Sequence, residues 1–286
     1  MKIIFYDVEH GSCCHIITPN GKHILIDVGS KSDSSIVDYI NRKYYFGYGG
    51  YIDELIITHP HEDHIYDLPK LYRTLPPRVL YRPKAAFDIV PALDSAIHRQ
   101  IADCANQMNR SYNQPVSEEH VPTNDFTNGG VHFDIIEPDE RWCTKKDINT
   151  FSCIIVLSYN GYKFVLTGDN PANILYDMVT TNYQNICEKI RDATVLLAPH
   201  HGRSNEFCPE FFGCVNPQLT VVSDKSIMHG TQGDTSKLYK GRGAHLYGQD
   251  RYVLTTRNDG TISFDVDKGS CIVSFNQGVL QTKVNS

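Results

Sequence analysis

The sequence has no long apolar run and no recognisable leader. None of its apolar stretches approaches the roughly 20 residues needed to cross a bilayer. Met1 and Lys2 lead directly into Ile3-Ile4-Phe5, without the charged and then apolar pattern of a signal segment. We therefore expect a soluble cytoplasmic protein that has no membrane partner.

A disulfide framework is also missing. The chain has nine cysteines, an odd number, and none of them forms a Cys-x-x-Cys pair. Cys13 and Cys14 are adjacent, and Cys208 and Cys214 have five residues between them. This usage is typical of reduced, buried cysteines in a cytosolic protein, and it makes thiolate metal ligands an unfavoured interpretation.

An excess of positive charge is absent, because 27 Lys and Arg residues stand against 33 Asp and Glu residues, for a net charge of −6. That balance is not typical of a nucleic-acid-binding protein. Residues 111–140 hold seven acids and no Lys or Arg, whereas basic residues outnumber acids in 70–110 and 225–257. We interpret 111–140 as an acidic insertion in a single domain spanning residues 1–286, and we favour a mixed, solvated surface over two basic faces.

Metal-ligand residue types, in contrast, are concentrated in one short segment. The apolar run Leu55–Ile57 reads as a buried strand, and three histidines and two acids follow within a few residues. Imidazole and carboxylate groups suit zinc, manganese or iron. His59 and His61, two positions apart in an extended segment, point the same way and can chelate one ion. Asp63 and His64 then turn toward a second position nearby.

Similar residues follow other predicted strands. The hydrophobic pattern predicts strands over residues 2–8, 13–17, 22–26, 55–57, 79–81, 131–137, 154–158, 163–167, 194–198, 219–223, 252–256, 261–266 and 270–275. It predicts helices over residues 33–44, 65–75, 86–110 and 172–190. The residues at which apolar strands stop include Asp27, His59, Asp169, His200 and Asp224. Ligand types gathered at strand ends from distant parts of the chain indicate a metal site on the edge of a sheet.

Several motifs together resemble the metallo-β-lactamase superfamily. They are Leu25-Ile26-Asp27-Val28-Gly29, His59-x-His61-x-Asp63-His64, Thr167-Gly168-Asp169 and His200-His201-Gly202. Within that superfamily the chain is most similar to the metallo-β-lactamase domain of ComEC-type DNA-uptake proteins. The segments that carry this closer likeness are Asp7–Ser12, Thr18-Pro19-Asn20-Gly21, Asn149–Ser152, Leu166–Asp169, His200–Ser204 and Asp259–Phe264. The acidic insertion and the region 225–257 fit the closer likeness poorly.

The resemblance implies a fold and a ligand set. The fold is of the α/β (α+β) class, a four-layer αββα sandwich with mixed, mainly antiparallel sheets and two divalent ions, zinc or manganese, at one edge. By residue-to-residue transfer, His59 and His61 hold the first ion, Asp63, His64 and His200 hold the second, and Asp169 bridges the two. Asp27 is then an acid that orients a ligand histidine, although it also suits the end of its strand as a cap.

The chain departs from the family in one respect. Many members supply a third histidine to the first ion from a loop that here reads Asp147-Ile148-Asn149-Thr150. Either Asn149 or Asp147 supplies an oxygen instead, or the first site is weak. An oxygen donor shifts the preference from zinc toward manganese. The oxygen-reducing di-iron members usually have Glu at the position of His61, which argues against a redox function.

The implied chemistry is hydrolysis by a metal-bound hydroxide at a dinuclear centre. A phosphodiester is the favoured substrate, in a small molecule or in nucleic acid, which makes the chain a nuclease or a nucleotide phosphodiesterase. The residues that we expect to act beside the metals are Asp63 in catalysis, His229 as a proton donor to the leaving group, and His10, Arg203, Ser204 and Lys225 in substrate binding. His229 also suits a solvated loop. His201 is as good a ligand candidate as His200, but we prefer His200 because it follows its strand directly. We expect His201 and Asn149 to lie next to the metal ligands.

Two other functions remain open. The missing third histidine suits a degenerate domain that binds a ligand or partner without turnover, and the fold also suits a thioester or lactam hydrolase. Metal content distinguishes the binding module from the enzyme. The sequence makes no prediction about the oligomeric state.

Overall fold

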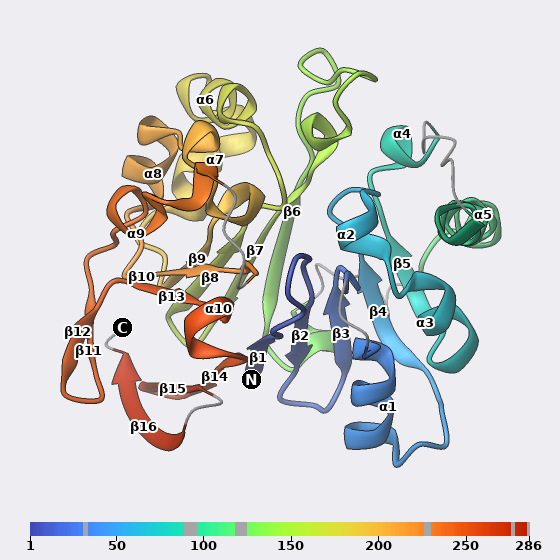
Figure 1. Cartoon of the computed structure of the whole chain (residues 1–286), viewed down its shortest axis with the longest axis horizontal. Coiled ribbons are helices and arrows are strands. Elements are labelled where there is room, and N and C mark those ends of the chain that lie inside the picture. The colour runs from blue at the N-terminus through green and yellow to red at the C-terminus, as the bar shows by residue number, and fades with distance from the viewer. Residues whose placement is uncertain (31–33, 89–95, 118–124, 226–229, 276–277, 285–286) are drawn as a thin grey trace.

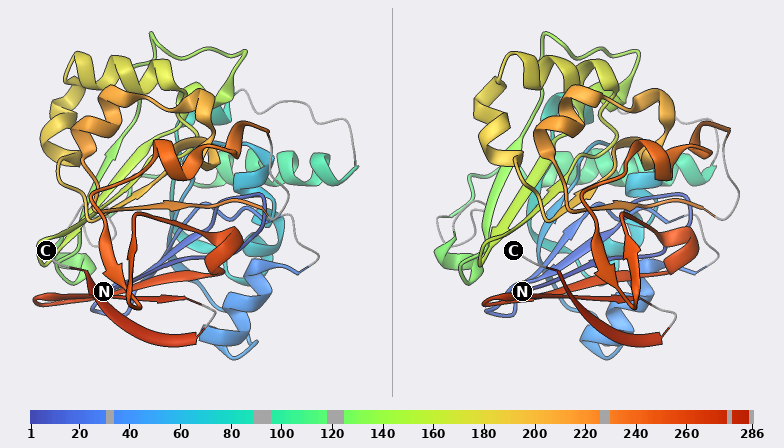
Figure 2. Two further views of the ribbon diagram at one scale, coloured as in Figure 1. Left: turned by 60° about the vertical axis from the view of Figure 1, so that its left-hand side comes forward. Right: turned by 90° about the vertical axis from the view of Figure 1, so that its left-hand side faces the viewer.

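The computed structural model describes residues 1–30, 34–88, 96–117, 125–225, 230–275 and 278–284. Most of its strands form two sheets that face each other (Figures 1 and 2). The first has the order β16 (Gly278–Val284), β15 (Ser270–Phe275), β14 (Ile262–Asp267), β1 (Lys2–Phe5), β2 (Cys14–Ile17), β3 (His23–Ile26), β4 (Ile52–Ile56), β5 (Pro77–Tyr81). The second has the order β13 (Val253–Thr255), β10 (Leu219–Val222), β9 (Val195–Leu197), β8 (Tyr162–Leu166), β7 (Ile154–Tyr159), β6 (His132–Ile136). A separate ribbon pairs β11 (Ala244–Leu246) with β12 (Gln249–Arg251).

Helices cover the outer face of each sheet. Those beside the first sheet are α1 (Ile36–Tyr45), α2 (Glu62–Ile65), α3 (Leu68–Thr74), α4 (Lys84–Phe87) and α5 (Ala96–Ser111). Those over the second sheet are α6 (Ala172–Thr180), α7 (Ile186–Ile190) and α8 (Pro209–Val215). Two short helices, α9 (Thr235–Leu238) and α10 (Thr256–Asp259), lie in the C-terminal third. No helix in the described ranges is long and apolar enough to span a membrane.

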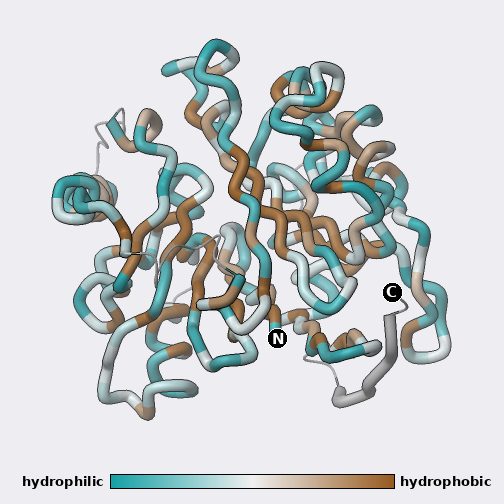
Figure 3. Tube along the Cα trace, turned by 180° about the vertical axis from the view of Figure 1, so that it is seen from behind, coloured by the Kyte–Doolittle hydropathy of each residue, from teal (hydrophilic) through white to brown (hydrophobic). Residues whose placement is uncertain are grey.

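Alternating side chains explain the layers. In β8, Phe164 and Leu166 join the core between the sheets, while Val165 joins the core beneath α6 and α8. In β4, Ile56 faces the inter-sheet core and Leu55 packs with α1 and α3. A strand whose two faces are both buried reads as an almost continuous apolar run. Figure 3 shows such apolar residues concentrated along the central strands. The predicted αββα sandwich is confirmed, with antiparallel pairs in the majority among the described strands.

Three predicted helices differ from the observed ones. The predicted helix 65–75 begins three residues later than predicted, as α3 at Leu68, because Ile65 is the last residue of α2 and Tyr66 and Asp67 form a turn. The predicted helix 172–190 is interrupted between α6 and α7, where Asn182, Gln184 and Asn185 adopt positive φ angles of 46°, 50° and 59°. The left-handed region is incompatible with a continuing α-helix. The predicted helix 86–110 corresponds to the end of α4 and to α5, and 89–95 lie outside the described residues.

Glu54 is a buried carboxyl group within β4. It is 1% exposed, and neither carboxylate oxygen has a hydrogen-bond partner among the described residues. Burial raises the pKa of Glu54 to about 7, although the charge of Lys22 opposes the shift. A folded-state pKa above the unfolded value means that the folded protein holds this proton more tightly. Its contribution to stability is therefore complete below about pH 4.5 and is lost as the pH rises through about 7.

The variant Glu54→Gln should remove this pH dependence. Because glutamine does not ionise, the free energy of unfolding of the variant, relative to that of the native chain, should rise by about 2–3 kcal/mol between pH 5 and pH 8. Urea denaturation at a series of pH values measures the difference. A difference that stays constant across this range would show that Glu54 does not titrate near neutral pH.

Candidate metal centre

Two acids and two histidines converge at one edge of the sandwich. Their ligand atoms all lie within 4.8 Å of one another. This four-ligand group consists of Asp63, His64, Asp169 and His201. Asp63 and His64 belong to α2, which follows β4, while Asp169 follows β8 and His201 follows β9. Segments more than a hundred residues apart in sequence thus supply one site.

His64 is held between two carboxylates. Its Nδ1 lies 2.7 Å from Oδ2 of Asp27, and its Nε2 lies 3.2 Å from Oδ1 of Asp169. Asp27 also accepts hydrogen bonds from the backbone N–H and the hydroxyl of Thr58, both at 2.8 Å. A histidine that donates Nδ1–H to a carboxylate presents Nε2 as the metal-binding atom. Asp27 therefore orients His64 and also ends its own strand.

His201 is held in the same manner by a backbone group. Its Nδ1 donates to the carbonyl oxygen of Ser223 at 2.8 Å, and its Nε2 lies 3.3 Å from Oδ2 of Asp63 and 3.7 Å from Oδ2 of Asp169. Both His200 and His201 adopt left-handed backbone angles, with φ of 48° and 55°. Consecutive non-glycine residues in this region are uncommon and typical of functional sites.

His59 and His61 lie next to the four-ligand group. The ring centroid of His59 is 4.8 Å from that of His61 and 4.2 Å from that of His64. Nε2 of His59 is buried and has no hydrogen-bond partner among the described residues. A buried imidazole nitrogen without a partner is costly unless a ligand binds it. His59 and His61 therefore offer imidazole donors for a metal ion next to the four-ligand group.

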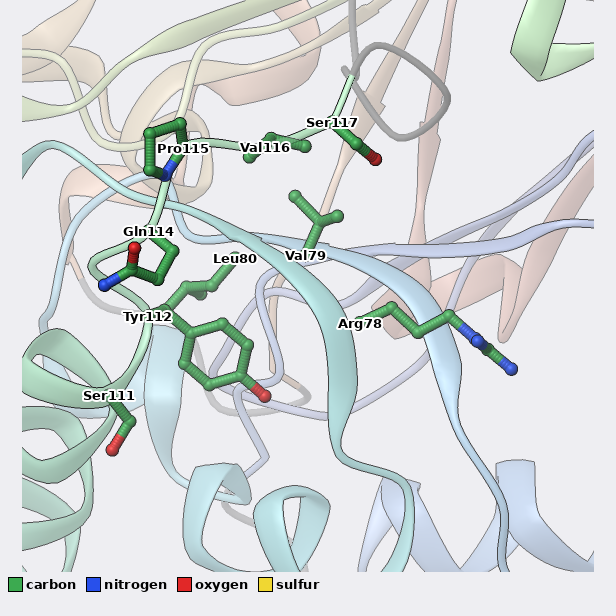
Figure 4. A pocket seen from close by; sticks show the side chains of 9 residues that line it. All are labelled: Arg78, Val79, Leu80, Ser111, Tyr112, Gln114, Pro115, Val116 and Ser117. Atoms are coloured by element: carbon green, nitrogen blue, oxygen red, sulfur yellow. The ribbon is translucent and has the colours of Figure 1, made fainter.

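The enclosed space at the four-ligand group is very small. A cavity of about 10 Å³ is lined by residues that include His64, Asp169 and His201. That volume suits one water molecule or one ion rather than an organic group. A pocket of about 270 Å³ lies elsewhere, between β5 and the segment that follows α5 (Figure 4). None of its lining residues belongs to the four-ligand group, so we assign the chemistry to the smaller cavity.

Burial and mutual charge set the protonation of the group. Burial depresses the pKa of His59 far below its ordinary value, and it also lowers the pKa of His61. Burial acts in the same direction on His64 and His201, but the neighbouring carboxylates outweigh it and raise both pKa values. The pKa of Asp169 is depressed, because the charges of His64 and His201 overcome the effect of burial. Metal ions compete with these protons for the same atoms.

Backbone contacts fix the loop that carries Asp63. The carbonyl oxygen of Asp63 accepts a hydrogen bond from the N–H of Ser12 at 3.0 Å, and the N–H of Gly29 donates to the carbonyl of Ser12 at 2.9 Å. A Cβ atom on Gly29 would lie 1.5 Å from the Asp63 carbonyl oxygen, and one on Gly11 would lie 2.8 Å from it. Because Gly11 and Gly29 have no side chain, the loops that contain Gly11, Gly29 and Asp63 can pack closely against one another next to the site.

The structure brings His201, rather than the preferred His200, into the four-ligand group. His200 remains close, with its Nε2 3.8 Å from Oδ2 of Asp169 and its Nδ1 3.8 Å from Oε1 of Glu206. The reason for the difference is the left-handed turn, which places the second histidine over the Ser223 carbonyl. Adjacent histidines in such a turn cannot be ranked from their distance to the strand.

The loop that lacks the third histidine lies beside His61. The charge of Asp147 contributes to the pKa of His61, and the Asp147 side chain accepts from the N–H of Asn149 at 3.1 Å. Oδ1 of Asn149 is buried without a hydrogen-bond partner among the described residues. The loop therefore contains two oxygen-bearing side chains, of which Asp147 is close enough to His61 to act on its pKa.

The predicted substrate-binding residues lie at different distances from the group. Nε2 of His10 is 3.6 Å from Oδ2 of Asp63, and its ring centroid is 4.9 Å from that of His201. Arg203 acts on the pKa of His200, which burial lowers first and this charge lowers further. Lys225 reaches Glu9 at 3.9 Å, and Ser204 begins a short 3-10 turn after Arg203. His229 lies outside the described residues.

Three groups near the site were not predicted from the sequence. They are Thr58, which links Asp27 to the histidine motif, Ser223, whose carbonyl holds His201, and Ser152, whose hydroxyl accepts from the N–H of Asp169 at 3.3 Å. Asp224, predicted from its strand-end position, is fully buried, and its Oδ2 lies 3.4 Å from a guanidinium nitrogen of Arg257. Backbone carbonyls and hydroxyl groups leave no distinctive pattern in a single sequence.

Comparison with known proteins shows the family. Residues 9–171, more than half of the chain, match the model of the metallo-beta-lactamase superfamily. The chain belongs to this superfamily, and it is similar to hydrolase-like enzymes with metal sites. No curated protein sequence matches it.

Several solved structures share the fold at low identity. A mutant of the CmlA beta-hydroxylase is 12% identical, with a TM-score of 0.52 over 93% of this chain and 54% of that one. The metallo-beta-lactamase fold protein YhfI from Bacillus subtilis is 12% identical, with a TM-score of 0.48 over 84% and 94%. A mutant metallo-beta-lactamase from Cronobacter sakazakii is 16% identical, with a TM-score of 0.41 over 71% and 78%. At these identities the likeness concerns the fold and leaves the substrate open.

Proposed function

We propose that this chain is a hydrolase that uses two divalent ions, zinc or manganese, to cleave a phosphodiester. The observation that carries the proposal is the four-ligand group with the unpartnered His59 beside it. When bound, such ions make water nucleophilic near neutral pH and stabilise negative charge that develops on the electrophile. His64 and His201 would hold them through Nε2, because their Nδ1 atoms are already bonded.

The side chains around the group supply the remaining functions. Asp63 is more exposed than Asp169, so it is the acid placed to take a proton from an attacking water. His10 lies 3.6 Å from Asp63, and Nε of Arg203 has no hydrogen-bond partner among the described residues. Both can donate to phosphate oxygens. The motif likeness to ComEC-type domains supports the same substrate class. Asn149 or Asp147 would complete the first site with oxygen, which favours manganese.

A substrate panel tests this function. We expect the purified chain to hydrolyse bis(p-nitrophenyl) phosphate when Mn²⁺ or Zn²⁺ is added, and we expect the double variant His61→Ala, Asp169→Ala to show no hydrolysis. A thioester and a chromogenic β-lactam are assayed in parallel. Faster cleavage of either of these than of the phosphodiester would contradict the substrate class. Failure to hydrolyse any of the three with either metal would instead support a binding module.

A further inference from the structure

An aromatic loop joins α1 to β4 at the end of the first sheet that is remote from the metal centre. Together with the last two residues of α1, it reads Tyr44-Tyr45-Phe46-Gly47-Tyr48-Gly49-Gly50-Tyr51, which contains only aromatic residues and glycine. The histidine motif follows the opposite end of β4. At about 3.3 Å per residue, the five residues of β4 separate the loop from this motif by about 16 Å. Figure 1 shows the loop below β4 and α2 above it. The proposed hydrolysis does not use this loop.

Three aromatic side chains of the loop face solvent, whereas Tyr44 and Tyr45 are partly buried against the core beneath α1. Phe46 is 81% exposed, Tyr48 is 93% exposed and Tyr51 is 58% exposed. Tyr39, on the adjoining helix α1, is exposed as well. Single exposed aromatic residues are ordinary, but several on one loop are typical of an interaction surface.

The backbone of the aromatic loop is fixed. The N–H of Gly49 donates to Oδ1 of Asn41 at 3.0 Å, and the N–H of Gly50 donates to the carbonyl of Thr74 at 3.2 Å. A Cβ atom on Gly49 would lie 2.9 Å from the Thr74 carbonyl oxygen. Hydrogen bonds and close contacts therefore hold the loop in one conformation, so little ordering entropy is lost when a partner binds.

Phe46 has an unfavourable backbone conformation as well as an exposed ring. It ends α1 with a φ of 54°, in the left-handed region where glycine or asparagine is usual at a helix end. A bulky residue there costs conformational free energy. Because its ring is mostly in solvent, packing within the chain does not compensate for this cost.

Cations border the aromatic loop. Nζ of Lys43 lies 5.2 Å from the ring centre of Tyr39 and 5.5 Å from that of Tyr44. The guanidinium of Arg78 lies 5.3 Å from the ring centre of Tyr51, and Figure 4 shows this side chain extending away from the other residues that line the pocket.

Two acids lie near these cations, and both are engaged by other groups. Asp38 pairs with Lys70, and Asp53 accepts from the N–H of His23. The exposed Arg42 adds a third cation beside Lys43. The surface thus combines exposed rings with basic side chains.

We propose that the aromatic loop is a docking surface for single-stranded nucleic acid. Bases stack on Phe46 and Tyr48, and the phosphates meet Arg42, Lys43 and Arg78. The loop contains no aliphatic residue, whereas segments that bind membranes combine aromatic with aliphatic side chains. The inference rests on the proposed phosphodiesterase function and narrows its substrate class from phosphodiesters in general to nucleic acid.

Binding in the presence of EDTA tests the surface separately from hydrolysis. We expect a fluorescent single-stranded oligodeoxynucleotide to bind the native chain, and the double variant Phe46→Ala, Tyr48→Ala to bind at least about fivefold more weakly. The matched control is Phe126→Ala, Tyr176→Ala, because Phe126 is 91% exposed and Tyr176 is also exposed. Its affinity should equal that of the native chain. Thermal unfolding confirms that both double variants are folded.

A variant with fewer positive charges tests the contribution of the basic side chains to binding. Arg42→Gln, Lys43→Gln should weaken binding and flatten the dependence of the affinity on salt, because fewer counterions are released. Equal binding by the native chain and the Phe46→Ala, Tyr48→Ala variant would overturn the proposal. So would binding to phosphatidylserine vesicles that needs Phe46 and Tyr48, without binding to the oligonucleotide.

The two proposals fail in different ways. Hydrolysis of bis(p-nitrophenyl) phosphate by a chain that binds no oligonucleotide would reject the docking surface and keep the phosphodiesterase. Binding of the oligonucleotide in EDTA that depends on Phe46 and Tyr48, without hydrolysis under any metal, would keep the docking surface and reject the phosphodiesterase.

Discussion

Asp169→Asn should lower the metal-dependent rate of hydrolysis by at least about 100-fold while the chain stays folded. Asp169 is the acid with the most histidine partners in the centre. Nε2 atoms of His64, His201 and His200 lie 3.2, 3.7 and 3.8 Å from its carboxylate. Asparagine has nearly the same shape but lacks the negative charge, so the variant separates the charge of this residue from its volume.

The control for Asp169→Asn is the same substitution on the surface. Asp250 lies in the β11–β12 ribbon and pairs with the exposed His245, so Asp250→Asn should leave the rate unchanged. Steady-state rates with Mn²⁺ and with Zn²⁺, together with thermal unfolding of each protein, give the comparison. If Asp169→Asn retains more than about one tenth of the native rate, Asp169 does not act at the centre of the chemistry.

Asp27→Ala should destabilise the protein by about 3–5 kcal/mol. Asp27 is 1% exposed and accepts three hydrogen bonds, two from Thr58 and one from His64. Alanine would leave the buried Thr58 N–H without an acceptor, and it would leave Nδ1 of His64 with only the 3.3 Å contact to the Thr58 hydroxyl. A buried donor without an acceptor carries its full desolvation cost.

The variant Asp27→Asn tests the effect of Asp27 on metal affinity separately from its effect on stability. Asparagine tolerates the left-handed backbone of this position, where φ is 58°, and it retains one oxygen for Thr58. It removes the charge beside His64, so we expect metal affinity to fall by about 10- to 100-fold with a smaller loss of stability. Urea denaturation in EDTA and metal titration measure the two effects. An Asp27→Ala variant within about 1 kcal/mol of the native stability would contradict this role for the buried carboxylate.

The layers of the fold could be predicted from the sequence because they depend on two local signals, apolar runs and turn motifs. Strands buried on both faces, such as β8 and β9, appear as apolar runs, and Thr18-Pro19-Asn20-Gly21 marks the first hairpin. The interruption at Asn182 to Asn185 was not predictable in the same way. Met178 and Ile186, on either side of it, are buried in the same core and keep the spacing of one helical face, so the apolar pattern does not reveal the left-handed residues between them.

The composition of the site was predictable, but its detailed geometry was not. The motifs locate Asp63, His64 and Asp169 because metal-ligand residue types follow apolar strands. The choice between His200 and His201 depends on a carbonyl group of Ser223, which belongs to a neighbouring strand end and has no sequence signal. The substitution of oxygen donors at Asn149 and Asp147 for the usual third histidine stays a prediction.

The metal content of the chain, purified without chelator or affinity tag, tests the central claim most directly. Elemental analysis should find about two divalent ions per chain in the native protein, and fewer in Asp169→Asn, because the charge of Asp169 acts on His59 and His61 as well as on His64 and His201. Fewer than about one tightly bound ion in the native protein, together with no gain when Mn²⁺ or Zn²⁺ is added, would contradict a dinuclear hydrolase.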